Sequence, residues 1–453
     1  MADFSSTNPF DGKKLADYPA FPLDQLDSTL VAADQAQKAW KRTAMSDRAR
    51  MLRQVAEQLR ERSESLATMA TREMGKTLVS SRAEVEKCAW VCEHFADHAA
   101  DMLADAPVDA DYSKSYYSHQ PLGVVLAIMP WNFPYWQAFR FMAPALMAGN
   151  AVVLKHASNV SGCALAIEEL MRAAGLDDGL FRTLLMSSKN VSRVIEHPLV
   201  RAVTFTGSTD AGRAVASQAG KALKKSVLEL GGSDPYVVLS DADLDLAVEQ
   251  CCNSRLINNG QSCIAAKRFI VHESLYGEFA EGMKEAMSRK KSGDPMAEDT
   301  DVGPLARPDL CDDVAAQVKE SIRLGAVLMC GGERRDNFYS PTVLTEVRPG
   351  MPAFDEEVFG PVAALIRARS DEEALVLANQ SEFGLGAAIF TRDAGKGETM
   401  ARERLEAGCV FVNGFVKSDP RLPFGGIKNS GYGRELAAPG IREFTNIKTV
   451  VVE

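Results

Sequence analysis

The chain lacks the cysteine and charge patterns that mark several large protein classes. Its nine cysteines include no C-x-x-C pair, which argues against a disulfide framework or a zinc ribbon and favours a reducing compartment. Acidic residues (61) outnumber basic ones (51), and the formal net charge is −10, whereas nucleic-acid binding needs clustered lysine and arginine. The composition therefore predicts no nucleic-acid partner and a cytoplasmic location.

The chain also has no long apolar segment that we expect to span a membrane. The stretch Pro121–Phe139 carries no charged side chain, but Pro130, Asn132 and Pro134 interrupt it. A lipid-exposed helix would leave backbone groups unpaired around those prolines. We expect a buried strand, a turn and a helix there, and no membrane partner. Met1–Phe10 contains no apolar core of a signal peptide, so we expect none.

Metal-binding patterns are equally sparse. His94 and His98 are four residues apart, but Phe95 follows His94 where the H-E-x-x-H motif has glutamate. We expect both histidines to lie on a helix beside Cys88 and Cys92, and we predict no metal site.

What the sequence does contain is a regular alternation of apolar strands and helices, which is typical of parallel, doubly wound sheets. Helical periodicity covers about Ser28–Leu103. The strands predicted next are Gly123–Met129, Ala151–Lys155, Phe181–Met186, Ala202–Thr206, Ser226–Leu230 and Tyr236–Leu239. A second alternation follows, with strands at Arg268–Val271, Ala326–Met329, Val362–Arg367, Gly386–Phe390 and Gly408–Val412. The pattern predicts an α/β protein with two such units.

Two further segments have the character of an extended arm. Asp109–Ser118 alternates polar and aromatic residues, as an exposed hairpin or arm would. Asn446–Glu453 shows a weak alternation of polar and apolar residues and contains three consecutive valines, as an edge strand with an unpaired side would. Together they predict a homo-oligomer, a dimer or a tetramer.

Cys263 is the candidate nucleophile. It lies in the polar segment Asn259–Ile264, about thirty residues after Glu229 in Leu228–Gly232. A thiol with a pKa near 8.5 is only about 3% thiolate at pH 7, so a reactive cysteine needs a lowered pKa or a separate base. Glu229 could be that base. The alternative is a buried free cysteine, the commoner fate of this residue type.

A nucleotide site is predicted where the first unit's strands end. Ligands bind beyond the carboxyl ends of such strands, near helix N-termini. G-x-G-x-x-G is absent, but Ala202–Thr206 leads into a turn in which Gly207 and Ser208 could approach a pyrophosphate and Gly212 could pack tightly. Such turns are also common caps, and Lys155, at another strand end, could simply be solvated.

Seven ordered segments remove most of this ambiguity. They are Pro130–Pro134, Lys155–Ser158, Phe205–Ser208, Leu228–Gly232, Gly260–Cys263, Glu356–Pro361 and Pro423–Gly426. The set resembles the aldehyde dehydrogenase superfamily across nearly the whole chain, and is most similar to bacterial succinate-semialdehyde dehydrogenases. The resemblance implies an aldehyde dehydrogenase-like fold, a nicotinamide cofactor and a thioester mechanism.

The resemblance also implies a three-part protomer. Residues 1–106 and 122–229 would bind the cofactor, and residues 230–419 would form the catalytic region. Residues 107–121 and 436–453 would serve oligomerisation, and residues 420–435 would return to the cofactor region.

For catalysis, the resemblance assigns three residues. Cys263 would attack the aldehyde, while the Asn132 amide and the Cys263 backbone N–H hold the oxyanion. Glu229 would activate the water that hydrolyses the thioester, and could deprotonate the thiol earlier. Alternatively, Asn132 could cap the following helix and Glu229 could be a paired carboxylate at a strand end.

For the cofactor, the informative position is Ser158, where many relatives have glutamate. A carboxylate there would repel a 2′-phosphate, while Ser158 beside Lys155 would accept it. We therefore predict NADP, with NAD as a weaker cofactor. Glu357 and Phe359 match the positions at the nicotinamide ribose and ring, although they could form a plain turn. The full predicted cofactor set is Trp131, Asn132, Lys155, Ser158, Gly207, Ser208, Gly212, Leu230, Glu357 and Phe359.

For the substrate, Trp136 and Arg140 lie four residues apart and share a helix face near Asn132. An arginine in an uncharged segment should meet a carboxylate, and Ser418 could add a second donor. Both fit a carboxylate-bearing aldehyde, with succinate semialdehyde as the first choice. Alternatively, Arg140 forms an internal ion pair with a protein acid.

Other functions stay open. The substrate could be another semialdehyde or an uncharged aldehyde. A CoA-acylating dehydrogenase is disfavoured because such relatives generally lack the carboxylate of Glu229. A cysteine hydrolase would need a histidine in a recognisable motif, and a non-catalytic scaffold would not need Cys263, Glu229 and Asn132 together.

Overall fold

The structure, a computed structural model, describes residues 4–453. Its first α/β unit has a six-stranded sheet in the order β21-β9-β8-β5-β6-β7, in which only β21 is antiparallel to its neighbour. The strands are β5 (Val124–Met129), β6 (Ala151–His156), β7 (Phe181–Thr183), β8 (Val200–Thr206), β9 (Lys225–Glu229) and β21 (Gly431–Tyr432).

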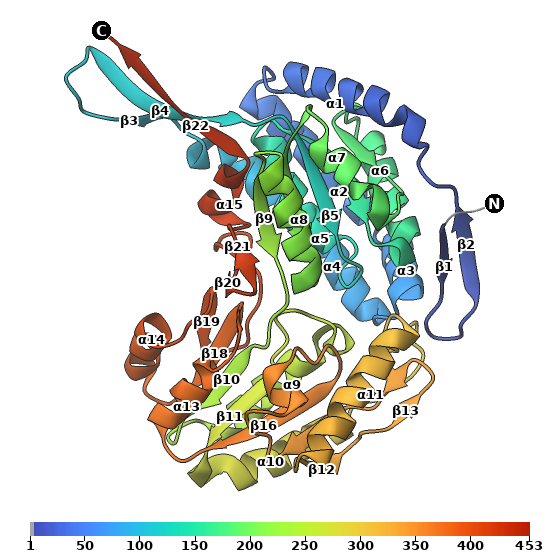
Figure 1. The fold of residues 1–453 in the computed structure, drawn as a ribbon, viewed down its shortest axis with the longest axis vertical. Coiled ribbons are helices and arrows are strands. Elements are labelled where there is room, and N and C mark those ends of the chain that lie inside the picture. Colours follow the sequence, from blue (N-terminus) through green and yellow to red (C-terminus); the bar gives the residue numbers. More distant parts are fainter. Residues whose placement is uncertain (1–3) are drawn as a thin grey trace.

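Helices cover this sheet, and they explain why its strands are so apolar. Every residue of β5 is buried, as expected for a strand packed on both faces. The helices are α1 (Leu26–Trp40), α2 (Met45–Glu61), α3 (Ser63–Met74), α4 (Leu78–Met102), α5 (Trp136–Met147), α6 (Ser161–Ala173), α7 (Val191–Glu196) and α8 (Thr209–Lys221). Figure 1 shows this unit in blue to green above the second one.

The second unit has a seven-stranded sheet in the order β12-β15-β16-β11-β10-β18-β19, parallel except for β12. Its strands are β10 (Pro235–Val238), β11 (Arg268–His272), β12 (Val327–Cys330), β15 (Thr342–Thr345), β16 (Val362–Ala368), β18 (Gly386–Phe390) and β19 (Cys409–Val412). Alternate residues of β11 enter different cores: Ile270 joins one, and Phe269 and Val271 the other. This alternation follows from the two-residue period of a strand.

The helices of the second unit lie on both faces of this sheet. They are α9 (Leu244–Leu256), α10 (Glu273–Ser288), α11 (Pro308–Arg323), α12 (Pro352–Asp355), α13 (Asp371–Asn379) and α14 (Ala394–Glu403). The remaining short strands are β1 (Phe4–Thr7), β2 (Lys14–Tyr18), β13 (Arg334–Arg335), β14 (Phe338–Tyr339), β17 (Phe383–Gly384) and β20 (Ile427–Lys428).

A three-stranded arm extends away from the body at one end (Figure 1). Strand β22 (Thr445–Val452) follows α15 (Ala437–Glu443) and pairs antiparallel with β4 (Lys114–Pro121), which also pairs with β3 (Ala106–Pro107). Apolar side chains of the arm are exposed, among them Ile447 at 64%. The predicted arm and C-terminal edge strand are thus confirmed, and they pair with each other.

The α/β architecture with two largely parallel sheets is confirmed, and most strand boundaries agree within two residues. The exception is the strand predicted to reach Met186, because β7 ends at Thr183 and the chain turns into a short 3-10 helix that starts at Ser188. His94 and His98 lie on α4, as expected. Within residues 4–453, no helix is long and apolar enough to cross a bilayer.

Candidate active site

Cys263 lies where two cavities meet. One, of about 390 Å³, is lined by residues of α4 and α5 and of the segment before β20. The other, of about 400 Å³, lies beyond the carboxyl ends of β5, β8 and β9. Cys263 and Gln137 line both cavities. A nucleophile placed there can be reached by two different molecules at once.

An unusual backbone stretch positions Cys263. Asn258, Asn259 and Gly260 have φ of 55°, 60° and 79°, in the left-handed region that asparagine and glycine adopt most readily. A side chain at Gly260 would clash, because its Cβ would lie 2.4 Å from the carbonyl carbon of Gly360. The Asn258 amide donates to the carbonyl of Gln261 at 3.1 Å. The loop that presents the cysteine therefore favours asparagine at positions 258 and 259 and requires glycine at position 260.

The surroundings of the Cys263 thiol disfavour its ionised form. Burial raises its pKa to about 12, and the positive charges of Lys267 and Arg140 offset this only in part. Lys267 donates from Nζ to the carbonyl of Cys263 at 2.5 Å and to that of Ser262 at 2.8 Å. The lysine therefore holds the backbone beside the nucleophile, and a base must still remove the thiol proton.

Asn132 is oriented by the same loop. Its side-chain Nδ2 donates to the backbone carbonyl of Gln261 at 3.1 Å. Its backbone carbonyl accepts from the side-chain amide of Asn258 at 2.7 Å. An amide nitrogen carries two protons, so one N–H of Asn132 remains to donate to an oxyanion. Asn132 lines the cavity beyond the β5, β8 and β9 ends, as Cys263 does.

Asn132 does not cap the following helix, which was the alternative role. Helix α5 begins after Tyr135 without a side-chain cap from its N-cap residue. Instead, Glu84 of α4 accepts from the backbone N–H groups of Tyr135 and Trp136, each at 2.8 Å. The other Glu84 oxygen pairs with buried Lys76. A carboxylate distant in sequence therefore fixes the start of α5 and the turn that carries Asn132.

Glu229 ends β9 and is 2% exposed. Burial raises its pKa to about 8, assisted by the negative charge of Glu435 and opposed by Arg140 and Arg434. Its Oε1 has no hydrogen-bond partner among residues 4–453, which does not fit the alternative of a fully paired carboxylate at a strand end. The Glu229 side chain does not line either cavity in this conformation, so it lies behind the site rather than in it.

Most of the predicted cofactor residues line the second cavity. These are Trp131, Asn132, Lys155, Gly207, Ser208, Leu230, Glu357 and Phe359. Ser158 instead lines a neighbouring cavity of about 520 Å³, which shares Lys155 with the second cavity. Gly212 lines neither cavity; a Cβ there would lie 2.4 Å from the Leu230 side chain, so its glycine allows close packing.

Glu357 and Phe359 are more than parts of a turn. Glu357 accepts from the backbone N–H of Gly232 at 3.0 Å. Phe359 packs edge-on against Trp131, with ring centroids 5.8 Å apart. Sequence reasoning missed Arg307, whose guanidinium lies 5.6 Å from the Trp131 ring and which lines the same cavity.

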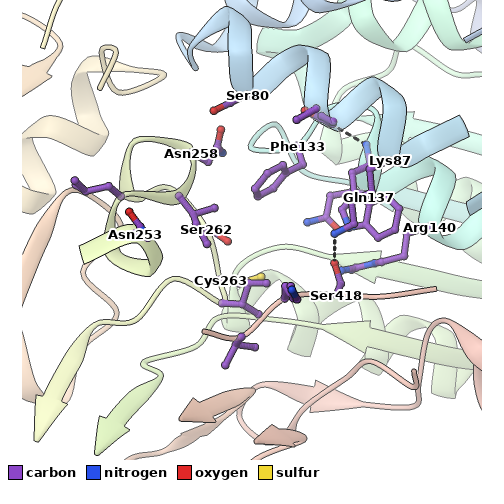
Figure 2. A pocket seen from close by; sticks show the side chains of 18 of the residues that line it. Ser80, Lys87, Phe133, Gln137, Arg140, Asn253, Asn258, Ser262, Cys263 and Ser418 are labelled. Carbon is purple, nitrogen blue, oxygen red and sulfur yellow. Dashed lines mark hydrogen bonds between the residues drawn. The ribbon is translucent and has the colours of Figure 1, made fainter. Parts of the chain in front are cut away.

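The predicted substrate residues Trp136, Arg140 and Ser418 all line the first cavity. Figure 2 labels Arg140 and Ser418 there. However, Arg140 already has a carboxylate partner. Its guanidinium pairs with Glu435, and the two side chains are 2% and 3% exposed. The alternative of an internal ion pair is therefore the arrangement observed, because a buried arginine needs a partner within the protein.

The sequence model of the aldehyde dehydrogenase family matches residues 2–450. The chain belongs to this family. It is 48% identical to succinate-semialdehyde dehydrogenase [NADP(+)] 1 of Mycobacterium tuberculosis H37Rv, over 98% of this chain and 99% of the relative. It is 47% identical to succinate semialdehyde dehydrogenase [NAD(P)+] Sad of Escherichia coli K12, over 98% and 97%.

Solved structures of other proteins show the same family similarity. Succinic semialdehyde dehydrogenase of Streptococcus pyogenes, crystallised with NADP+ as the cofactor, superimposes with a TM-score of 0.97 at 37% identity and covers 99% of each chain. Succinate-semialdehyde dehydrogenase of Burkholderia pseudomallei gives a TM-score of 0.96 at 36% identity, over 99% of this chain and 94% of that one.

In this aldehyde dehydrogenase, sequence reasoning missed five charged residues that line the first cavity: Glu84, Lys87, Lys290, Asp301 and Lys417. Lys87, on α4, donates from Nζ to Ser418 Oγ at 2.8 Å and lies 4.2 Å from the Trp136 ring centroid. One signal was present: Lys87 follows buried Glu84 by three residues, so both share the helix face that α4 turns inward.

Proposed function

We propose that this aldehyde dehydrogenase oxidises succinate semialdehyde to succinate, with NADP as the preferred cofactor and NAD as the weaker one. The observation that carries the proposal is a cavity that joins Cys263 to a cationic wall containing Lys87, Arg140 and the hydroxyl of Ser418. An aldehyde with a carboxylate at its far end could place its carbonyl group at Cys263 and its carboxylate at this wall. The names of the relatives from M. tuberculosis and E. coli support the same substrate.

The first chemical step uses Cys263. Once its proton is removed, the thiolate adds to the aldehyde carbonyl and forms a thiohemiacetal, whose negative oxygen accepts from the Asn132 amide and the Cys263 backbone N–H. Fixed donors of this kind typically contribute about a hundred- to a thousandfold to the rate. The cofactor, when bound, accepts the hydride released on oxidation. Cys263 is left as a thioester.

The second step hydrolyses the thioester and regenerates the free enzyme. Glu229, as its carboxylate, takes a proton from water, and the resulting hydroxide attacks the thioester carbonyl. The acid product leaves and Cys263 regains its thiol. Because Glu229 lies behind both cavities, its side chain must turn toward Cys263 before it can act.

The second cavity has features that fit a dinucleotide. Gly207 leaves space over Phe205, since a Cβ there would lie 2.6 Å from the ring. Ser208 precedes α8 and makes no side-chain cap, so the first N–H groups of that helix can donate to phosphate. Lys155 is the last residue but one of β6, and burial lowers its pKa, as expected for an ammonium held close to a ligand site.

A panel of aldehydes tests the substrate. We expect kcat/KM for succinate semialdehyde to exceed that for butanal, an uncharged aldehyde of the same length, by about ten- to a hundredfold, because a charged hydrogen bond contributes about 1.5–3 kcal/mol. Higher values with butanal or glutarate semialdehyde would favour those alternatives. NADPH formation that depends on CoA would instead indicate an acylating dehydrogenase, and no NADPH with any aldehyde would indicate a scaffold.

The cofactor choice is tested at Ser158. We expect wild-type kcat/KM to favour NADP over NAD, and Ser158→Glu to reduce the NADP value by about ten- to a hundredfold through repulsion of the 2′-phosphate. Ser188→Glu is the matched control, because Ser188 is an exposed serine of the same cavity and should change the ratio much less. A clear wild-type advantage for NAD would contradict the proposal.

The assembly belongs to the same proposal. The exposed apolar side chains of β22 support a homodimer or homotetramer formed through the arm of residues 107–121 and 436–453. Residues 1–106 and 122–229 would bind the cofactor, and residues 230–419 would form the catalytic region. The pairing of β21 with β9 supports a return of residues 420–435 to the cofactor region. We place the enzyme in the cytoplasm.

A further inference from the structure

We propose that His156 is a positioning residue, whose imidazole ties the end of β6 beside the second cavity to the turn that carries Asn132. The oxyanion donor is thereby held in a fixed place relative to the cofactor. This inference deepens the proposed function and rests on it, because it names a group that sets the position of the Asn132 amide.

The place of His156 in the chain is the first reason. It is the last residue of β6 and is 3% exposed. The residues on either side of it, Lys155 and Ala157, both line the second cavity, whereas His156 does not. Successive side chains of a strand point to opposite faces. The imidazole is therefore attached to the wall of the cofactor cavity but lies behind it.

The imidazole contacts the Asn132 turn. Its Nε2 lies 2.8 Å from the carbonyl oxygen of Pro134, two residues after Asn132. A carbonyl oxygen only accepts, so Nε2 carries the ring proton and donates it. The other ring nitrogen, Nδ1, accepts at 2.9 Å from the backbone N–H of Ala157, which the Met129 carbonyl shares at 3.0 Å. The two contacts require the same tautomer of His156 and fix the direction of the ring.

The charge state of His156 preserves this link. Burial lowers its pKa to about 4; the hydrogen bond to Pro134 opposes this change, and the positive charge of Lys155 adds to it. Above that pH the ring is neutral and has one donor and one acceptor, which match its two partners. The link is therefore complete throughout the neutral pH range.

The Asn132 turn is held from three directions. The loop of Cys263 holds the Asn132 carbonyl, Glu84 of α4 holds the first N–H groups of α5, and His156 holds the turn from the side of β6. The backbone ladder between β5 and β6 ends at His156, so the imidazole continues that connection beyond the sheet. Loss of this donor would deprive a buried carbonyl of its partner, which favours movement of the turn.

The test measures the single-turnover rate constant for NADPH formation, with enzyme in excess over succinate semialdehyde and with saturating NADP. We expect His156→Leu to lower this rate constant by about ten- to a hundredfold, because a displacement of about 1 Å can cost a hundredfold. The Kd for NADP, followed by fluorescence, should change much less, since Lys155 and Ser158 are intact.

Two polar variants test the contact with Pro134 itself. His156→Gln keeps an N–H donor at the distance of Nε2 along the side chain, and should recover most of the loss. His156→Asn keeps an acceptor for Ala157 but is too short to reach Pro134, so it should resemble His156→Leu. Equal rate constants in the Gln and Asn variants would overturn the inference, even if His156→Leu fails to fold.

A double-mutant cycle distinguishes positioning from a general loss of structure. Asn132→Ala alone should lower the rate constant by about a hundred- to a thousandfold. In that background, His156→Leu should lower it further by less than about threefold, because the donor that His156 positions is already absent. Losses that multiply would show that His156 acts independently of Asn132 and would overturn the inference.

His94→Leu is the matched control. His94 is also a buried histidine, 9% exposed, but it lies on α4 and lines neither cavity. Its loss should leave the rate constant within about threefold of wild type. A loss equal to that of His156→Leu would contradict a specific role for His156.

Nitrogen-15 spectra of histidine-labelled enzyme give a readout that does not depend on rate. The His156 signal, identified by its absence in His156→Gln, should show the neutral tautomer with the proton on Nε2 from about pH 6 to about pH 9. A proton on Nδ1, or a charged ring in that range, would exclude the proposed link.

The outcomes separate this inference from the proposed function. Oxidation of another aldehyde but not of succinate semialdehyde would overturn the proposed substrate, and the same cycle with that aldehyde would still test His156. An undiminished rate constant in Asn132→Ala would overturn the proposed chemistry and this inference together. A large loss in Asn132→Ala with an unchanged rate constant in His156→Leu would overturn the inference alone.

Discussion

Replacement of Cys263 by alanine is expected to reduce aldehyde-dependent NADPH formation by about four orders of magnitude or more, the scale seen when a covalent nucleophile is removed. The reason lies in the site: Cys263 lines both cavities, and no other described cysteine lines either of them. The measurement is the steady-state rate of NADPH absorbance with saturating succinate semialdehyde. Binding of NADP, followed by fluorescence, should persist, because the second cavity remains.

Cys409→Ala is the matched control for this experiment. Burial raises the pKa of Cys409 to about 12, as it does for Cys263, but Cys409 lies on β19 away from both cavities. Its loss should leave the rate within about threefold of wild type, the range expected for a mild packing change. More than about one per cent residual activity in Cys263→Ala would contradict the thioester mechanism.

Replacement of Glu229 by glutamine is expected to separate the two chemical steps. The first turnover should still yield NADPH, because Cys263 and Asn132 are intact, unless Glu229 also deprotonates the thiol. The thioester should then accumulate, and the steady-state rate should fall by about a hundred- to ten-thousandfold, as for loss of a general base. Stopped-flow absorbance should show a burst of about one NADPH per active site followed by a slow phase. A uniform loss without a burst would place Glu229 in the first step as well.

The raised pKa of Glu229 predicts the pH profile of the wild-type rate. A base acts only when deprotonated, so the hydrolytic rate should be low below pH 8, rise through about pH 8 and then level off. Glu435→Gln removes the negative charge that helps to raise this pKa, and should shift the midpoint to lower pH. In Glu229→Gln the inflection near pH 8 should disappear.

The surroundings of Glu229 account for its raised pKa. The side chain lies among Arg140, Glu435 and Gly425, and a Cβ on Gly425 would come within 2.8 Å of Glu229 Oε1. Gly425 also has φ of 153°, where only glycine is relaxed. We expect a neutral carboxyl in this pocket not to compete with the substrate, and to act as the base after its side chain turns toward Cys263.

The sequence by itself determined the parts of the protein that depend on local patterns. Buried strands such as β5 were visible because a strand covered on both faces must be continuously apolar. The motif segments located Cys263, Asn132 and the cofactor cleft, because each chemical role demands a residue type at a fixed place in a turn. Family membership followed from the order of those segments.

Only the tertiary structure decided where the charges of the site find their partners. Arg140 and Glu435 are far apart in the sequence, as are Lys87 and Ser418, and no periodicity links such positions. Their pairing depends on how α4 and α5 pack against the segment before β20 and the segment between β21 and α15. The strength of an ion pair depends on the distance between its charges and on their burial, and not on how far apart the residues lie in the sequence. The role proposed for Cys263 could therefore be predicted from the sequence, while the partner of Arg140 required the fold.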